Sequence, residues 1–214
     1  ILDNPRADRV KKVAALAGRS ARSKQGKILV EGPQAVRELV RYRSSFVEDV
    51  YYTALAAQMH PDVIEDARRA CPWVHEVTDE VSEVLSRDSQ GICAVARVGA
   101  IQSELPEIHA GDCVVVLAQG RDPGNAGTIM RTADAMGARA IIAVKGSVDA
   151  SNPKVIRSSA GSVFHLPIVP LSSFDEACQR LRDQHCVILG TSGAQGAYSL
   201  SELMSQAALE GRGW

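Results

Sequence analysis

The sequence has 214 residues, of which 45% are hydrophobic and 23% are charged, and its formal net charge is −1. These values are typical of one large or two small globular domains that can bury a core without disulfide or metal support. No window approaches the roughly 18 uninterrupted apolar residues of a membrane span. No basic and apolar leader with a small-residue cleavage site is present, so we expect neither a membrane protein nor a secreted one.

The cysteines and the charges narrow the class of protein further. The five cysteines form no Cys-x-x-Cys pair and the five histidines are widely spread, so we expect no metal site and reduced thiols in a cytoplasmic protein. Residues 1–27 carry eight basic and two acidic side chains, a balance of +6, and the remainder has −7. Such a basic segment is expected of a surface that follows phosphates, although a solvated helix face or a loose tail would look the same.

Alternating apolar strands and amphipathic helices predict a small α/β domain in residues 1–98. The predicted helices are 4–17, 34–41, 61–70 and 80–85, the predicted strands are 27–30, 49–53, 74–77 and 92–98, and 19–26 is a polar segment predicted as a loop. Residues 99–110 have no clear periodicity and contain Gly99 and Pro106, so they are predicted to be a linker.

The same alternation predicts a second α/β domain in residues 111–214. The predicted strands are 113–118, 140–144, 162–169 and 186–190, and the predicted helices are 125–136, 153–159 and 174–184. The apolar runs VVVLA, AIIAV and VILG are typical of parallel strands that are buried under helices on both faces.

The turn after the first strand of this second domain carries the densest chemical signal. The segment 122–125 reads Asp-Pro-Gly-Asn and lies where ligands gather in open α/β sheets, outside the carboxyl end of a strand. Asn125 is suited to cap the following helix, and Gly127 permits close approach of another backbone. Arg131, one turn later, is expected to project toward the same cleft. Spacing alone leaves open an ordinary surface arginine that is paired with Asp134 or Asp122.

Three segments resemble one known family. The pattern Asp-Pro-x-Asn-x-Gly-x-Ile-x-Arg-x-x-x-Ala-x-Gly over 122–137 resembles the first signature motif of the SpoU class of SPOUT RNA 2′-O-ribose methyltransferases. Residues 152–162 resemble the family's Lys-x-x-Arg-x-Ser-x-Gly segment. Residues 26–32 are similar to its substrate-binding domain, which resembles a small ribosomal-protein fold.

The resemblance implies a substrate-binding α/β domain followed by a SPOUT α/β domain with a trefoil knot. It implies transfer of a methyl group from S-adenosylmethionine to a ribose 2′-hydroxyl in RNA, with Asn125 and Arg131 as catalytic residues. Leu189, Gly190 and Thr191 follow a predicted strand where family members meet the cofactor's adenosine half, with a plain loop as the alternative. The knotted domains of the family pair, so a homodimer is expected.

The basic residues are interpreted in the same frame. Arg19, Arg22 and Lys24 of the N-terminal segment are expected to bind RNA phosphates, and neutralising them is expected to lower the affinity for RNA. Lys154 and Arg157 fit the same role, with a structural salt bridge as the alternative.

The family's second motif begins with Gly-Asn-Glu and, with the third motif, builds the knot and much of the cofactor pocket. Neither is found up to Trp214, so the resemblance predicts that the methyltransferase domain is incomplete at its C-terminus and that the knot segment is missing.

Ribosomal RNA, and 23S rRNA first, is the favoured substrate. The two-domain form with Val-Glu-Gly at 30–32 is closer to family members that modify rRNA, including those of the thiostrepton-resistance type. A tRNA methyltransferase and a noncatalytic RNA-binding or ribosome-assembly protein are the alternatives. A nicotinamide-dependent enzyme is disfavoured, because no Gly-x-Gly-x-x-Gly follows a strand.

Overall fold

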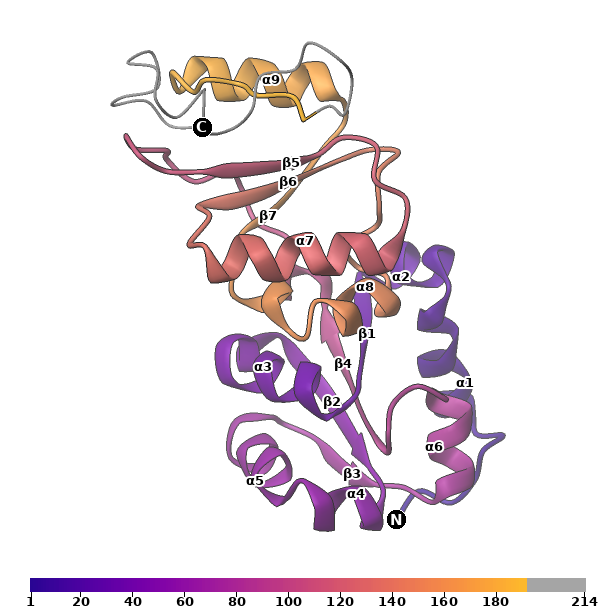
Figure 1. Ribbon diagram of the computed structural model, residues 1–214. Helices are drawn as coiled ribbons and strands as arrows, with labels where there is room; N and C mark the ends of the chain where they lie inside the picture. The colour runs from indigo at the N-terminus through magenta and orange to yellow at the C-terminus, as the bar shows by residue number, and fades with distance from the viewer. Residues whose placement is uncertain (192–214) are drawn as a thin grey trace.

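Four strands of the first half of the chain form one sheet in the order β1-β4-β2-β3. The computed structural model describes residues 1–191 (Figure 1). The strands are β1 (Lys27–Glu31), β2 (Val47–Tyr52), β3 (Val74–Glu76) and β4 (Ile92–Arg97). Strand β4 runs antiparallel to β1 and β2, and β2 is parallel to β3. Successive side chains of a strand point to opposite faces, so Ile28 and Val30 enter one buried cluster while Leu29 enters another.

Helices cover both faces of this sheet, as Figure 1 shows. On one face lie α3 (Pro33–Arg43) and α5 (Pro61–Ala70), which pack on each other, with α4 (Ala54–Met59) beside α5. The other face is covered by α1 (Asp8–Ala14) and α6 (Asp79–Leu85). The expected strands and the helix over 61–70 are confirmed within one or two residues, whereas α4 was not predicted.

The predicted loop over 19–26 is wrong, because the structure forms helix α2 (Arg19–Gln25) there. The helix ends at Gly26, whose φ of 64° is a left-handed conformation that glycine adopts without strain. The polar composition concealed this helix because its single buried side chain, Arg22, is charged. The predicted helix over 4–17 is shorter than expected, since it starts at Asp8 and ends in a 3₁₀ turn.

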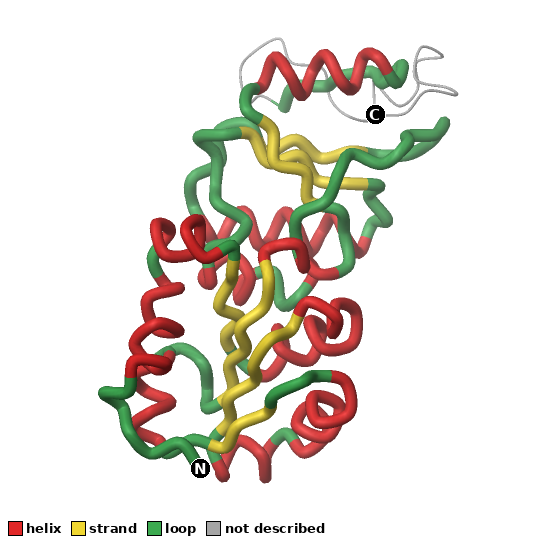
Figure 2. Tube along the Cα trace, turned by 180° about the vertical axis from the view of Figure 1, so that it is seen from behind, coloured by secondary structure: helices red, strands yellow, loops and turns green. Residues whose placement is uncertain are grey.

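The second domain contains three parallel strands in the order β5-β6-β7. They are β5 (Val114–Leu117), β6 (Ala140–Val144) and β7 (Ile168–Leu171). Helices α7 (Pro123–Ala135) and α8 (Pro153–Ser158) lie on one side of this sheet, and α9 (Phe174–Asp183) lies on the other (Figure 1). The parallel sheet between helical layers is the arrangement that the apolar runs predict. Seen from behind in Figure 2, the two sheets are joined by a 3₁₀ turn (Val98–Ala100) and the largely irregular segment 101–113 that follows it.

Two strand predictions in this domain are wrong. Residues 162–164 form a 3₁₀ turn after Gly161 at φ 95°, and β7 begins only at Ile168. Residues 186–190 are not a strand, because their backbone pairs with no other strand in the described part of the chain. The expected knot and residues 192–214 lie outside the described residues.

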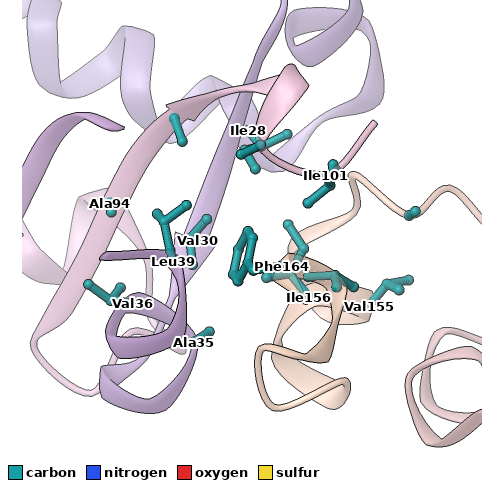
Figure 3. Close-up of a cluster of buried hydrophobic side chains, with 14 of the residues drawn as sticks. Ile28, Val30, Ala35, Val36, Leu39, Ala94, Ile101, Val155, Ile156 and Phe164 are labelled. Carbon is teal, nitrogen blue, oxygen red and sulfur yellow. The ribbon is translucent and has the colours of Figure 1, made fainter. Parts of the chain in front are cut away.

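One apolar cluster spans both domains, as Figure 3 shows. The ring of Phe164 lies between Val30 and Leu39 of the first domain and Ile156 of the second. Phe164 and Ile156 are fully buried. Because burial of apolar area favours a fixed contact, the two domains are held in one orientation by their packed interface and not by the linker alone.

In the range 1–191, no helix has the length and apolar character that crossing a membrane requires.

Candidate active site

Helix α7 presents the residues of the first motif from the carboxyl end of β5. Asp122 caps the helix, because its Oδ1 accepts a hydrogen bond of 2.7 Å from the backbone N–H of Asn125. The expectation that Asn125 itself is the cap is therefore wrong. Its side chain is exposed in the first turn, so its amide is available to a ligand.

Arg131 lies two turns further along the same helix and is exposed. Its two expected partners are engaged elsewhere: Asp122 caps α7, and Asp134 Oδ2 lies 2.7 Å from Nδ1 of His165. Within residues 1–191, none of the ion pairs involves Arg131. The structure thus leaves its guanidinium accessible to a ligand.

Gly127 sets the distance between the two motif segments. A Cβ at this position would lie 2.0 Å from Ser158 Oγ and 2.6 Å from the carbonyl carbon of Ser158, on α8. Ser158 Oγ in turn donates to the carbonyl oxygen of Pro123 at 2.8 Å. The small residue expected for a close backbone approach is therefore required, and it joins α8 to the start of α7.

The two basic residues of α8 have different surroundings. Lys154 is exposed in the first turn and takes part in no ion pair among the described residues. Arg157 Nη1 donates to Glu31 Oε2 at 2.6 Å and lies 2.9 Å from Asp88 Oδ2, both on the first domain. The salt-bridge alternative thus describes Arg157, and the predicted phosphate contact does not fit it.

Arg22 is also a contact between domains. Its side chain is 5% exposed, and it donates to the Leu16 and Ala17 carbonyls and to Asp149 Oδ2 at 2.8 Å. Burial tends to raise the pKa of Asp149, but hydrogen bonds from Ser151 and Arg22 outweigh it and lower that pKa below its usual range. The predicted RNA contact of Arg22 does not fit this position, because the side chain is buried and four of its five N–H donors, including Nε to Ser151, are used inside the protein.

Arg19 and Lys24 remain on the surface of the same helix. The Arg19 side chain is 79% exposed and reaches Asp149 only at 4.0 Å, and Lys24 is exposed. Arg19 lines a hollow of about 250 Å³ together with residues 143–151, which end β6 and follow it. It therefore lies beside the carboxyl end of the parallel sheet, where ligands of such sheets bind.

Leu189, Gly190 and Thr191 line a cavity of about 590 Å³ between β5, α9 and the segment that follows α9. Its other walls are formed largely by apolar side chains, among them Leu117, Ile129 and Phe174. Cys113 and Cys186 also line it, and burial raises the pKa of both thiols, helped at Cys186 by the charge of Asp112. This size and polarity suit a nucleoside. No charged side chain of the described residues lines the cavity, so these residues fit the adenosine half of S-adenosylmethionine but not its charged amino-acid end.

Sequence reasoning missed the residues that fix the domains together. His165 lies between Asp134 at 2.7 Å and Glu38 at 3.0 Å, and Arg43 Nε donates to the carbonyl of Phe164 at 3.0 Å. These contacts join residues more than a hundred positions apart in most cases, so no local spacing could have revealed them. One signal in the sequence pointed to such contacts: a charged residue, Glu31, ends the apolar strand β1.

Two family models match the chain. The SpoU rRNA Methylase family matches residues 112–210, and the MRM3-like substrate binding domain matches residues 7–94. The mitochondrial rRNA methyltransferase 3 of Mus musculus is 31% identical over 154 residues, which are 71% of this chain and 37% of that protein. The 23S rRNA (guanosine(2553)-2′-O)-methyltransferase RlmP of Bacillus subtilis is 28% identical over 92% of this chain and 75% of its own length.

Solved structures give the same result. The AdoMet-bound rRNA methyltransferase of Sinorhizobium meliloti superposes with a TM-score of 0.69 at 28% identity, over 84% of this chain and 67% of that one. Fold and site define a SPOUT-type methyltransferase domain joined to a substrate-binding domain. The chain belongs to the SpoU rRNA methylase family. It spans little more than a third of the mouse relative.

Proposed function

We propose that this protein transfers a methyl group from S-adenosylmethionine to a ribose 2′-hydroxyl of ribosomal RNA, most readily 23S rRNA. The observation that carries the proposal is Arg131, exposed on α7 with both neighbouring carboxylates engaged elsewhere. The names of the relatives, which include guanosine 2′-O-methylation of 23S rRNA, support this substrate. Transfer RNA is the second candidate, because one relative is named a tRNA/rRNA methyltransferase.

The reaction requires a positioned oxygen, an in-line methyl group and removal of the hydroxyl proton. S-adenosylmethionine, when bound, supplies an electrophilic methyl group on a sulfonium. Arg131 cannot serve as the base, because an arginine guanidinium has only N–H donors and no acceptor for a proton, so the hydroxyl proton passes to solvent. Its role in the proposal is to orient the 2′-hydroxyl and an adjacent phosphate through its planar fork of donors. The exposed amide of Asn125 offers a donor and an acceptor on the same helix.

In this proposal the RNA phosphates are bound by three exposed basic side chains, those of Arg19, Lys24 and Lys154. Phosphate contacts of this kind position a nucleic acid without reading its sequence. Arg22 and Arg157 instead form contacts between the two domains. They make no direct contact with RNA in this proposal and affect its binding only by fixing how the two domains are placed.

The adenosine half of the cofactor is assigned to the cavity that Leu189, Gly190 and Thr191 line. A Cβ on Gly190 would meet nothing within 4 Å, so the backbone there is open to a ligand.

Pairing of two copies and a cytoplasmic location complete the proposal. Ile129 on α7 and Met136, the C-cap residue of that helix, are 39% and 80% exposed, and exposed apolar side chains of this kind favour association. Sedimentation of the full chain measures the pairing. The domain limits of the proposal are 1–98 for RNA binding and 111–214 for methyl transfer, with 99–110 as the linker.

The test compares Arg131→Lys with the unchanged protein in methyl transfer to rRNA, with the product identified as a 2′-O-methyl nucleoside by mass spectrometry. Lysine keeps the charge but cannot present a two-pronged donor, so we expect transfer slower by about 100-fold, the cost of one well-placed donor. Arg87→Lys, in the turn after α6, is the matched control, since Arg87 is exposed and its one ion pair among the described residues is with Glu83. A near-normal rate for Arg131→Lys would contradict the orienting role, and an unchanged protein that binds RNA without transferring methyl groups would favour the noncatalytic alternative.

A further inference from the structure

The substrate-binding domain has an open depression of about 820 Å³ that the proposed methyl transfer does not use. It lies where β2 and β3 begin and β4 ends, and α1 borders it. The residues that line it are Arg9, Val47, Glu48, Asp49, Pro72, Trp73, His75 and Arg97. None of them belongs to the second domain, so the depression is separate from the candidate active site.

Trp73 is the unusual member of this set. Its side chain is 64% exposed, although an indole has a large apolar area and normally finds cover. The backbone beneath it is fixed, because the carbonyl of Trp73 accepts a hydrogen bond of 2.9 Å from the N–H of Val50 in β2. The chain has only two tryptophans, four tyrosines and three phenylalanines, so it displays one of its few large aromatic rings on an anchored backbone.

Basic side chains lie around the indole. Arg97 donates to the Ser45 carbonyl at 2.6 Å and lies over the Phe46 ring, and among the described residues none of the ion pairs uses it. Arg9 is held by Tyr51 Oη at 3.0 Å and by Asp49 at 2.5 Å. The guanidinium groups are therefore already oriented, which lowers the entropic cost of binding a ligand.

The two carboxylates in the depression are neutralised by basic neighbours. Asp49 pairs with Arg9 and lies 3.0 Å from His75 Nε2. Glu48 pairs with Lys27 at 2.6 Å. A second hollow of about 280 Å³ shares Arg9 and Asp49 with the first and adds Lys12 and Lys27. Together the two hollows contain four basic and two acidic side chains, so the excess of charge is positive.

We propose that this surface binds an unpaired nucleotide of the RNA substrate, with its base stacked on Trp73 and its flanking phosphates held by Arg97 and Arg9. The inference rests on the proposed function, because it assigns a binding subsite to the same RNA. An exposed aromatic ring beside arginines is the combination that binds single-stranded nucleic acid, since every base has a face that can stack and every linkage carries a negative charge. The carboxylates of an acidic peptide would pair with the arginines, but aspartate and glutamate side chains have no aromatic ring to stack on the indole.

The experiment reads the fluorescence of Trp73 during titration with RNA in the absence of cofactor. The full chain carries Trp214→Phe, which leaves Trp73 as its only tryptophan. The two probes are a single-stranded adenosine hexanucleotide and a ribose-phosphate hexamer of equal charge that lacks bases, both at low ionic strength. We expect saturable quenching by the first probe and little change with the second. Equal quenching by both probes would overturn the stacking proposal.

Variants supply the second arm. Trp73→Ala, in the chain that retains Trp214, is expected to weaken binding of the labelled hexanucleotide about tenfold, and Trp73→Phe is expected to recover part of that affinity. Arg97→Ala weakens binding, whereas Arg87→Ala, in the turn after α6, removes the same charge outside the depression and leaves affinity nearly unchanged. Unchanged affinity in Trp73→Ala, or an equal decrease in Arg87→Ala, would overturn the proposal. Neither readout needs turnover, so an inactive enzyme with intact quenching would contradict the proposed function alone.

Discussion

Arg131 is available to a ligand because the two nearby acidic residues are hydrogen-bonded to other groups. Asp134 is drawn to His165 at 2.7 Å, and Asp122 is committed to the first turn of α7. An arginine whose donors are all engaged must break a contact before it binds a substrate, which costs free energy. Holding both carboxylates elsewhere leaves the guanidinium ready to bind.

The N-terminal arginines show that burial separates structural charges from binding charges. Arg19 and Arg22 lie three residues apart on α2, yet one side chain is 79% exposed and the other 5%. A charge can be buried only when its donors are satisfied, and Arg22 meets this condition through two carbonyls and Asp149. The same residue type thus has two roles within one helix.

We expect substitutions at the exposed and at the buried positions to change different quantities. Arg19→Ala and Lys24→Ala should weaken RNA binding and leave the free energy of unfolding unchanged. Each phosphate that is no longer neutralised should reduce the slope of log affinity against log salt by about one. Arg22→Ala should lower the free energy of unfolding by about 1.5–3 kcal/mol, the usual range for a hydrogen bond to a charged group. Filter binding over a salt series and denaturant unfolding measure the two quantities. A stable Arg22→Ala protein with weakened RNA binding would reverse the assignment.

At the scale of elements, the contact of α7 with α8 brings the two motif segments together. The contact depends on the absence of a side chain at Gly127, where α8 approaches closer than any Cβ allows. Ser158 then ties α8 to the first turn of α7 through Pro123. The turn that carries Asn125 is therefore held from one side by its Asp122 cap and from the other by α8.

Gly127→Ala is expected to lower the free energy of unfolding by about 1–3 kcal/mol, because the added methyl group overpacks the contact with α8. Gly120→Ala is the matched control, since a Cβ there meets nothing within 4 Å and no left-handed φ is required. Denaturant unfolding of both variants measures the difference. Equal stability of the two would show that α8 can move away from α7 without cost.

Most of the elements could be predicted because their burial follows a period that local sequence displays. Strand β6 and helix α5 fall on the expected residues, since a buried parallel strand is continuously apolar and an amphipathic helix repeats every three or four residues. Helix α2 failed the same test because its buried residue is a charged arginine that pairs across the domain interface.

The site was predicted in part for the same reason. The turn 122–125 and the exposed Arg131 follow from a contiguous motif, and Gly127 from its size. The partners of Arg157 and Arg22 could not be predicted, because Glu31 and Asp149 lie 126 and 127 residues away in the chain. Residues 186–190 have the composition of a strand, but a strand forms only when another backbone pairs with it.

At the scale of the whole molecule, the two domains act as one unit through a shared apolar core and several polar contacts. Phe164 and Ile156 pack against the first domain, and around them lie the pairs Arg22–Asp149 and Arg157–Glu31 and the bridge of His165. The proposed RNA-binding surface on the first domain is thereby held at a fixed position from the proposed methyl-transfer site on the second.

Acid is expected to loosen this interface through Asp149. Its pKa in the folded protein lies below the usual value near 3.9, so its stabilising effect is complete above about pH 5 and disappears as the pH falls through the lower folded pKa. The free energy of unfolding of the unchanged protein should exceed that of Asp149→Asn at neutral pH, and the gap should shrink between about pH 5 and pH 3. Denaturant unfolding across this range measures the gap. A gap that does not depend on pH would exclude the ionised carboxylate as its cause.

Ribose methylation by this protein can be measured by mass-spectrometric mapping of ribose methyl groups in rRNA from cells that contain the protein and from cells that lack it. We expect one or a few 2′-O-methyl groups to disappear with the protein, to return when it is restored, and to stay absent when the restored copy carries Arg131→Ala. An identical set of ribose methyl groups in both rRNA preparations, or a missing methyl group that proves to lie on a base, would contradict methyl transfer to ribose by this protein.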